Sequence, residues 1–332
     1  MKHFTRIADL GVAGVADVLD KALTWKKYPP DTHLDGKLLG MVFFNPSLRT
    51  RASFEAAMLR GGGHAIVLEV GSGVWKLEDR TGVVMDGDRP EHIREAIPVL
   101  GRYVDALAVR TFGALQDDDA DAADPVMHAF RELAGVPVIS MESAREHPCQ
   151  GLADLLTIHE RFSTTERLPV TLTWAPHIKP LPKAVPHSFL LTAAAAGCEV
   201  RVAHPPGFDL HPEVMAEAQT YARLSGGSVT VSTDQQQAVS GSQVIYAKAW
   251  GPATGQVSAD AAIARITAHK DWLITNKTLS CASRDAIFLH CLPVRRNVEV
   301  ADEVLDGTHS RVIDEAENRF HVQRVLLHRL LT

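Results

Sequence analysis

Short apolar runs alternate with amphipathic stretches along most of this 332-residue chain. The runs are rich in β-branched or aromatic residues and show little polar alternation, which is typical of strands buried on both faces of a parallel sheet. We predict strands at 38–44, 65–70, 106–110, 136–141, 170–174, 199–203, 228–232, 244–247 and 286–290. Helical patterns between these strands predict βαβ units and therefore an α/β fold.

The helical patterns divide the chain into two halves. We predict amphipathic helices after Val12 and around Phe54, and an alanine-rich helix at 188–196 that ends at Gly197, a residue typical of helix C-termini. A helix at 147–162 would connect two doubly wound domains, 1–146 and 147–310, each with its own parallel sheet. A terminal helix at 316–331, within a segment 311–332, is long enough to pack back on the first domain.

Two loops stand out by composition. The acidic segment 117–121 is expected to be a solvated loop, and segment 175–186 holds four prolines, which predict a stiff, non-helical connection. The net charge of -6 argues against a general nucleic-acid binder. The four cysteines form no Cys-x-x-Cys pair, which favours reduced thiols and a cytoplasmic location. We expect neither a signal peptide nor a membrane span.

One strand leads directly into a candidate anion site. The apolar run 38–44 is followed by Ser47-Leu48-Arg49-Thr50, where a helix is expected to begin. Free N–H groups at a helix N-terminus favour phosphate, hydroxyls add donors, and an arginine can bind phosphate through two hydrogen bonds. A simple helix cap formed by Ser47 or Thr50 is the alternative that these residues leave open.

Four ordered motifs carry a resemblance to a known family. Ser47-Leu48-Arg49-Thr50, His147-Pro148-Cys149-Gln150, His290-Cys291-Leu292-Pro293 and a terminal-helix Arg319 resemble the motifs of aspartate/ornithine carbamoyltransferases. The resemblance spans residues 43–319 and implies a carbamoyl-phosphate domain followed by an amino-acid domain. It assigns carbamoyl phosphate to the following residues: Ser47, Leu48, Arg49, Thr50, Trp75, Arg110, His147, Gln150, Cys291, Leu292 and Arg319. Arg110, His147, Gln150, Cys291 and Arg319 are the implied catalytic residues.

Other segments resemble the N-acylornithine branch of this family. The chain lacks the Asp-Gly-Asn-Asn and Ser-Met-Gly segments of ornithine enzymes, and it carries Tyr246-Ala247-Lys248-Ala249-Trp250 and the run 290–296 instead. By resemblance, Pro90, Glu142, His177, Lys248 and Arg295 contact the acylornithine. Acetylornithine relatives carry glutamate where this chain has Pro90. A carboxylate there would repel a succinyl carboxylate, so the proline favours N-succinylornithine.

The resemblance implies carbamoyl transfer from carbamoyl phosphate to the δ-amine of N-succinyl-L-ornithine, a step of arginine biosynthesis, without cofactor or metal. N-acetyl-L-ornithine is the alternative substrate, and a non-catalytic paralogue is the alternative from another class. The resemblance also implies a homotrimer, with Trp75 reaching a neighbouring subunit's site. It further implies a knotted chain, an exception to the rule against threading, with the crossing at 175–186.

Overall fold

A computed structural model describes residues 1–30, 33–252 and 258–332. Two parallel sheets organise the chain, in the order β2-β1-β5-β6 and β11-β10-β7-β8-β9. The strands of the first sheet are β1 (Leu38–Phe43), β2 (His64–Glu69), β5 (Ala106–Arg110) and β6 (Val138–Glu142). Those of the second are β7 (Pro169–Trp174), β8 (Glu199–Ala203), β9 (Ser228–Ser232), β10 (Val244–Lys248) and β11 (Ile287–Leu289). The predicted α/β fold with parallel sheets is confirmed.

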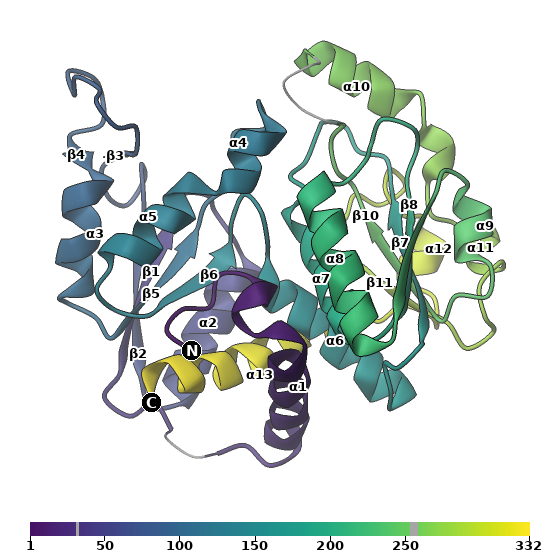
Figure 1. The fold of residues 1–332 in the computed structure, drawn as a ribbon, viewed down its shortest axis with the longest axis horizontal. Helices are drawn as coiled ribbons and strands as arrows, with labels where there is room; N and C mark the ends of the chain where they lie inside the picture. The colour runs from purple at the N-terminus through teal and green to yellow at the C-terminus, as the bar shows by residue number, and fades with distance from the viewer. Residues whose placement is uncertain (31–32, 253–257) are drawn as a thin grey trace.

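Helices cover both faces of the first sheet (Figure 1). Successive residues of β1 point to opposite sides: Met41 joins one hydrophobic core, and Val42 joins a second core. The second core is completed by α3 (Ile93–Gly101) and α5 (Pro125–Leu133), including Phe130. The other face packs on α1 (Gly11–Lys27), preceded by η1 (Ile7–Asp9), and on α2 (Arg49–Arg60).

The second sheet follows the same rule. In β10, Tyr246 faces the core shared with α7 (Ala184–Ala195) and α8 (Pro212–Ser225), whereas Ile245 faces a separate core. That separate core includes Val304. The second half also contains the short helices α9 (Gln235–Val239), α10 (Ala259–Thr267), η2 (Lys270–Trp272), α11 (Asn276–Leu279) and α12 (Asp302–Leu305).

Two long helices join the halves. Helix α6 (Pro148–Phe162) follows β6 and packs on both α7 and α13 (Val312–Leu331). Helix α13 leaves the second sheet and returns to pack on α1 and α2, as predicted for the terminal helix (Figure 1). Asn318 of α13 donates to Thr157 Oγ1 of α6 at 2.9 Å, which ties the two helices together.

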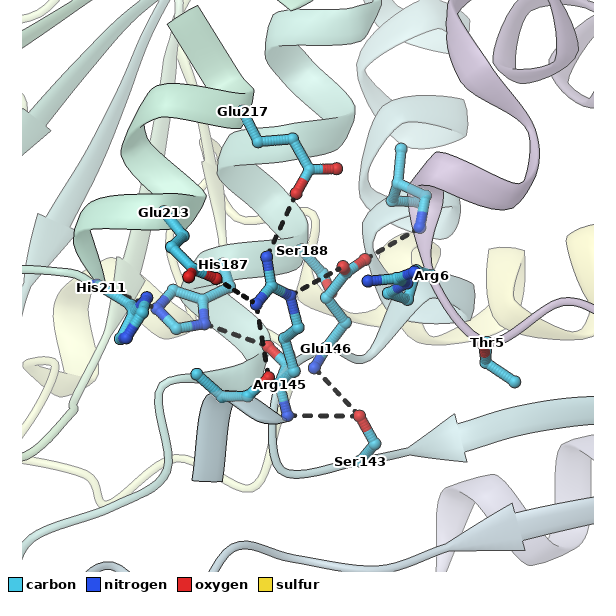
Figure 2. Close-up of polar contacts among 12 residues, drawn as sticks. Thr5, Arg6, Ser143, Arg145, Glu146, His187, Ser188, His211, Glu213 and Glu217 are labelled. Carbon is cyan, nitrogen blue, oxygen red and sulfur yellow. Dashed lines mark hydrogen bonds and ion pairs between the residues drawn. The ribbon is translucent and has the colours of Figure 1, made fainter. Parts of the chain in front are cut away.

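A cluster of polar side chains surrounds the connection between β6 and α6 (Figure 2). We call Ser143, Arg145, Glu146, Glu213 and Glu217 the connector cluster. The Arg145 guanidinium reaches Glu213 and Glu217 of α8, both at 3.3 Å. The Glu146 carboxylate accepts the Ile7 N–H from the first half at 2.9 Å. The cluster therefore ties the N-terminal segment, the connection and α8 to one another.

The structure corrects two predicted loops. Segment 117–121 is not a loop throughout, because α4 (Asp118–Ala123) begins after Asp117, whose carboxylate caps it by accepting from Asp119 and Ala120 N–H groups. Segment 175–186 is non-helical only until α7 begins at Ala184, so Pro186 lies in the first helical turn. Proline is tolerated there because the first N–H groups of a helix have no carbonyl partner within it.

Candidate active site

The carboxyl ends of both sheets face one cavity of about 710 Å³. Strands β1, β5 and β6 deliver the segment after Phe43, Arg110 and Glu142 from one side. Strands β7 and β10 deliver His177 and Lys248 from the other, and the segment after β11 adds Cys291 to Arg295. Sites of open α/β sheets lie at such carboxyl edges, where strand order reverses, as it does beside β1 and β7 here.

The predicted anion motif lies at the cavity wall. Ser47 to Thr50 line the cavity at the start of α2, so this helix directs its N-terminus toward the cavity. The Thr50 N–H donates to Ser47 Oγ at 3.3 Å, which is the capping contact that the sequence left open. The cap does not replace the anion site, because Arg49 Nε is buried without a hydrogen-bond partner among the described residues.

Three arginines and a histidine converge beside this motif. Arg110 pairs with Glu142, and Arg319 of α13 donates to the Thr50 hydroxyl. Arg49 completes the three. The His147 imidazole caps no helix, and burial together with the charge of Arg319 lowers its pKa well below the usual value. His147 is therefore a neutral imidazole among cations, able to donate one hydrogen bond to a developing oxyanion.

The Gln150 side chain is held with its oxygen free. Its Nε2 donates to Asp154 Oδ1 at 2.7 Å and to Glu315 Oε1 at 3.0 Å. Its Oε1 is buried and has no hydrogen-bond partner in the described part of the chain. Gln150 lines the cavity and keeps one unpartnered acceptor, which is what an amide ligand requires.

Cys291 and Leu292 form the opposite wall. Burial raises the pKa of the Cys291 thiol to about 12, so the group is a neutral thiol and no nucleophile. Leu292 has a left-handed φ of 51°, and its N–H donates to His290 Nδ1 at 3.0 Å. His290 in turn contacts Glu299 Oε2 through Nε2 at 3.2 Å, which fixes the backbone of this segment.

The second substrate region is cationic. Arg295 Nε donates to His177 Nε2 at 3.1 Å, and His177 Nε2 lies 3.9 Å from Glu299 Oε1. The same Glu299 oxygen accepts the Arg295 backbone N–H at 2.9 Å. The Lys248 side chain is 8% exposed, and its ammonium has no hydrogen bond or ion pair within residues 1–30, 33–252 and 258–332. A buried ammonium without a partner is costly, so it is suited to receive an anionic ligand.

Two predicted residues lie elsewhere. Trp75 is 61% exposed, and its indole N–H donates to Glu91 Oε2 at 2.7 Å. Pro90 is also exposed, and neither residue lines the cavity. Both belong to a projection containing β3 (Leu77–Glu78) and β4 (Glu91–His92), which extends beyond α3 (Figure 1). Within one subunit, the structure does not bring them to the other predicted residues.

Several site residues were missed by sequence reasoning. Lys179 and Glu299 line the cavity, and Asp154 and Glu315 lie behind Gln150. The sequence could have indicated Asp154 and Glu315. Asp154 is four residues after Gln150, Glu315 is four residues before Arg319, and residues four apart lie on the same face of a helix. Lys179 lies in an irregular loop, where no periodicity identifies a neighbour.

Comparison with known proteins covers the whole chain. Residues 2–160 match the carbamoyl-P binding domain of aspartate/ornithine carbamoyltransferase, and residues 182–330 match its Asp/Orn binding domain. N-succinylornithine carbamoyltransferase of Bacteroides thetaiotaomicron is 39% identical over 333 residues, covering 100% of this chain and 99% of its own length. N-acetylornithine carbamoyltransferase of Xanthomonas campestris pv. campestris is 40% identical over 332 residues, covering 98% and 97%.

Solved structures agree with this assignment. Acetylornithine transcarbamylase complexed with acetylcitrulline has a TM-score of 0.95 and 39% identity, covering 100% of both chains. A variant of N-acetyl-L-ornithine transcarbamylase with one glutamate replaced by proline is complexed with carbamyl phosphate and N-succinyl-L-norvaline. It has a TM-score of 0.94 and 39% identity, covering 99% of this chain and 100% of its own. Over the described residues, no helix is both long and apolar enough to cross a membrane.

Proposed function

This chain belongs to the aspartate/ornithine carbamoyltransferase family, and on that premise we propose that it carbamoylates the δ-amine of N-succinyl-L-ornithine. Carbamoyl phosphate is the donor, and the products are N-succinyl-L-citrulline and phosphate. The enzyme is a carbamoyltransferase, and its relatives place the reaction among N-acylornithine carbamoyltransferases of arginine biosynthesis.

The net charge of the cavity supports the succinyl group over the acetyl group. Six cationic side chains line it, and two carboxylates, Glu142 and Glu299, accompany them, which leaves an excess of four positive charges. The cations are Arg49, Arg110, Lys179, Lys248, Arg295 and Arg319. Carbamoyl phosphate brings about two negative charges at neutral pH, and an acylornithine with a neutral amine adds two if succinylated but one if acetylated. The succinyl compound therefore matches the cavity better.

The cavity groups support a direct transfer. The δ-amine, with an ordinary pKa near ~10.4, loses a proton and adds to the carbamoyl carbon, forming the new C–N bond. Arg110, His147 and Arg319 stabilise the oxyanion of the tetrahedral intermediate. The C–O bond to phosphate then breaks, and phosphate leaves, carrying the amine proton. Because the Cys291 thiol is neutral, no covalent intermediate forms on it. The rate enhancement then comes from the positioning of the two substrates and from the fixed charges of the cavity.

Pro90 supports the succinyl compound independently. By resemblance it occupies the place of a glutamate in acetylornithine relatives, and it adds no negative charge near the acyl group. The Glu-to-Pro variant of a solved relative is complexed with N-succinyl-L-norvaline, which agrees with this role for a proline. N-acetyl-L-ornithine is the second candidate, since the acetyl-type relative is as similar in sequence as the succinyl type.

We also propose a cytoplasmic homotrimer in which Trp75 and Pro90 complete a neighbouring subunit's site. Their exposure on a projection away from the cavity of their own subunit supports this arrangement. Light scattering on the purified protein should give a mass three times that of one chain. A monomer with full activity would exclude a shared site.

The decisive experiment offers three amines in parallel with carbamoyl phosphate: N-succinyl-L-ornithine, N-acetyl-L-ornithine and free ornithine. We expect kcat/KM to be highest for the succinyl compound, with formation of the carbamoylated product followed by mass spectrometry. A preference for the acetyl compound would keep the enzyme class and reject the acyl choice. No turnover of any amine would favour the non-catalytic paralogue.

A further inference from the structure

A buried pair of carboxyl groups fixes the orientation of the Gln150 amide. Both groups accept from the same nitrogen: Asp154 Oδ1 lies 2.7 Å and Glu315 Oε1 lies 3.0 Å from Gln150 Nε2. A primary amide nitrogen has two hydrogens, so both are engaged. The Gln150 oxygen is consequently the one polar atom of this amide without a partner among the described residues, and Gln150 lines the cavity.

The two carboxyl groups accept different numbers of N–H hydrogen bonds. Glu315 accepts with both oxygens, because its Oε2 also accepts the His290 N–H at 2.8 Å. Asp154 accepts the Gln150 N–H with Oδ1, and no N–H group among the described residues reaches its buried Oδ2. The Asp154 carboxyl group also lies beside Glu315 and the Tyr246 hydroxyl. Glu315 therefore links two walls of the cavity, the α6 wall that carries Gln150 and the segment of His290 to Leu292.

We propose that Asp154 and Glu315 are positioning residues that hold Gln150 Oε1 toward the cavity as the acceptor for the carbamoyl N–H groups. A rotated Gln150 would point its own N–H groups at the carbamoyl nitrogen, and two donors repel each other. The inference rests on the proposed function, since it assumes that carbamoyl phosphate binds here. Neither carboxyl group touches the substrate, so both act through Gln150.

The pKa values of both carboxyl groups in the pair are raised. Burial raises the pKa of Asp154 to about 7, and burial with the neighbouring Asp154 raises that of Glu315. Arg319 of α13, Tyr246 of β10 and Cys291 are the other ionisable groups that face the pair. A proton on Asp154 Oδ2 leaves all three N–H hydrogen bonds to the pair intact.

Because Glu315 accepts hydrogen bonds with both oxygens and Asp154 with one, we expect substitutions of the two residues to differ in their effect on kcat/KM. In Glu315→Gln, one end of the new amide must present N–H groups either to Gln150 Nε2 or to the His290 N–H, so a donor faces a donor. In Asp154→Asn, the new oxygen can accept from Gln150, and the new nitrogen takes the position of the unpartnered Oδ2. We expect kcat/KM for carbamoyl phosphate to fall ~30-fold in Glu315→Gln and ~3-fold in Asp154→Asn.

A double-mutant cycle distinguishes positioning from a general structural role. Gln150→Ala should itself lower kcat/KM for carbamoyl phosphate by ~100-fold. In that background the Glu315→Gln amide can accept the His290 N–H and point its nitrogen into the vacated space, so we expect less than ~3-fold further loss. Independent, multiplied losses would overturn the proposal, as would equal losses in Glu315→Gln and Asp154→Asn.

Stability gives a second readout in case Glu315→Gln folds poorly. Since removal of the Gln150 amide relieves the donor–donor contact, the Gln150→Ala/Glu315→Gln double variant should melt at a higher temperature than Glu315→Gln alone. A double variant that melts lower would refute the proposal. Turnover by the wild-type enzyme keeps the tests separate: no carbamoyl transfer by wild type rejects the proposed function, whereas normal wild-type turnover with additive variants rejects only the positioning role.

Discussion

The connector cluster and the cavity are both polar regions between the two sheets, yet their charges are arranged oppositely. In the connector cluster, three carboxyl groups surround one cation, Arg145, whose terminal nitrogens bond to Glu213, Glu217 and the Ala122 carbonyl. In the cavity, cations outnumber carboxylates, and Lys248 has no partner among the described residues. The comparison teaches that the structural cluster surrounds its cation with carboxyl groups of the same chain, whereas the cavity keeps an excess of positive charge that a ligand can neutralise.

The largest effect is expected from a substitution in the cavity. Arg49→Ala should raise KM for carbamoyl phosphate by ~100-fold or more, because it removes a bidentate phosphate partner. Arg51 provides the matched control: it lies on the same helix but is 3.0 Å from Glu55 and 2.6 Å from Glu69. Arg51→Ala should change KM less than ~3-fold. Equal KM values in the two variants would remove Arg49 from the phosphate site.

The next prediction concerns a substitution in the connector cluster. Arg145→Ala removes the cation from the exposed Glu213 and the partly buried Glu217 and empties a buried position, and we expect the free energy of unfolding to fall by about 1–2 kcal/mol. Urea denaturation followed by circular dichroism measures the change. At temperatures where the variant is folded, kcat/KM should stay within about threefold of wild type. A large kinetic loss in a folded, stable variant would show that the connector cluster belongs to the site.

Lys248→Ala tests whether the Lys248 ammonium binds a carboxylate of the second substrate. We expect KM for N-succinyl-L-ornithine to rise ~30-fold, with a smaller change in KM for carbamoyl phosphate, because a nearly buried cation loses its carboxylate ligand. Lys179→Ala, at an exposed position of the same cavity, should raise this KM only about threefold. The reverse order would place the substrate carboxylate at Lys179.

Glu146 makes the connector cluster sensitive to pH. Burial raises the pKa of this carboxyl group to about 8, whereas the unfolded chain titrates it near ~4.3. Its folded pKa is therefore the higher one, so the folded state binds more protons and stability falls as pH rises between these two values. Glu146→Gln cannot titrate. Its unfolding free energy relative to wild type should increase by roughly 1 kcal/mol per pH unit from pH 5 to pH 8. A constant difference would show that Glu146 is ionised in the folded protein.

The smallest expected effect sharpens the acyl choice. Pro90→Glu should lower kcat/KM for N-succinyl-L-ornithine about tenfold relative to N-acetyl-L-ornithine, through repulsion between the two carboxylates. Pro90→Ser, which adds no charge, controls for loss of the proline ring. Competition assays with both substrates measure the ratio directly. An unchanged ratio in Pro90→Glu would leave the charge of the cavity as the basis of selectivity.

Much of this arrangement could be predicted because buried parallel strands leave a strong local pattern. The strands 106–110, 199–203 and 228–232 begin and end where they were predicted. Side chains at or just beyond the carboxyl ends of β1, β5, β6 and β10 line one cavity, because the carboxyl edges of the two sheets face it.

What could not be predicted depends on packing over long distances. Helix α4 is short and acidic, and Lys183 of the second half reaches its Asp118 at 2.8 Å, a contact without a local signal. The charge imbalance of the cavity required all six cations to be placed together. The exposed positions of Trp75 and Pro90 also follow from a projection whose two-residue strands are too short to show periodicity.

The return of α13 to the first half has a consequence for biosynthesis. Arg319 and Glu315 are translated after both sheets, although they complete a site whose phosphate motif is made among the first fifty residues. A nascent chain can therefore pair every strand while its catalytic apparatus is still unfinished on the ribosome. Any premature stop before residue 312 removes both side chains at once. On the proposed function, a chain truncated before residue 312 lacks Arg319 and should not consume carbamoyl phosphate.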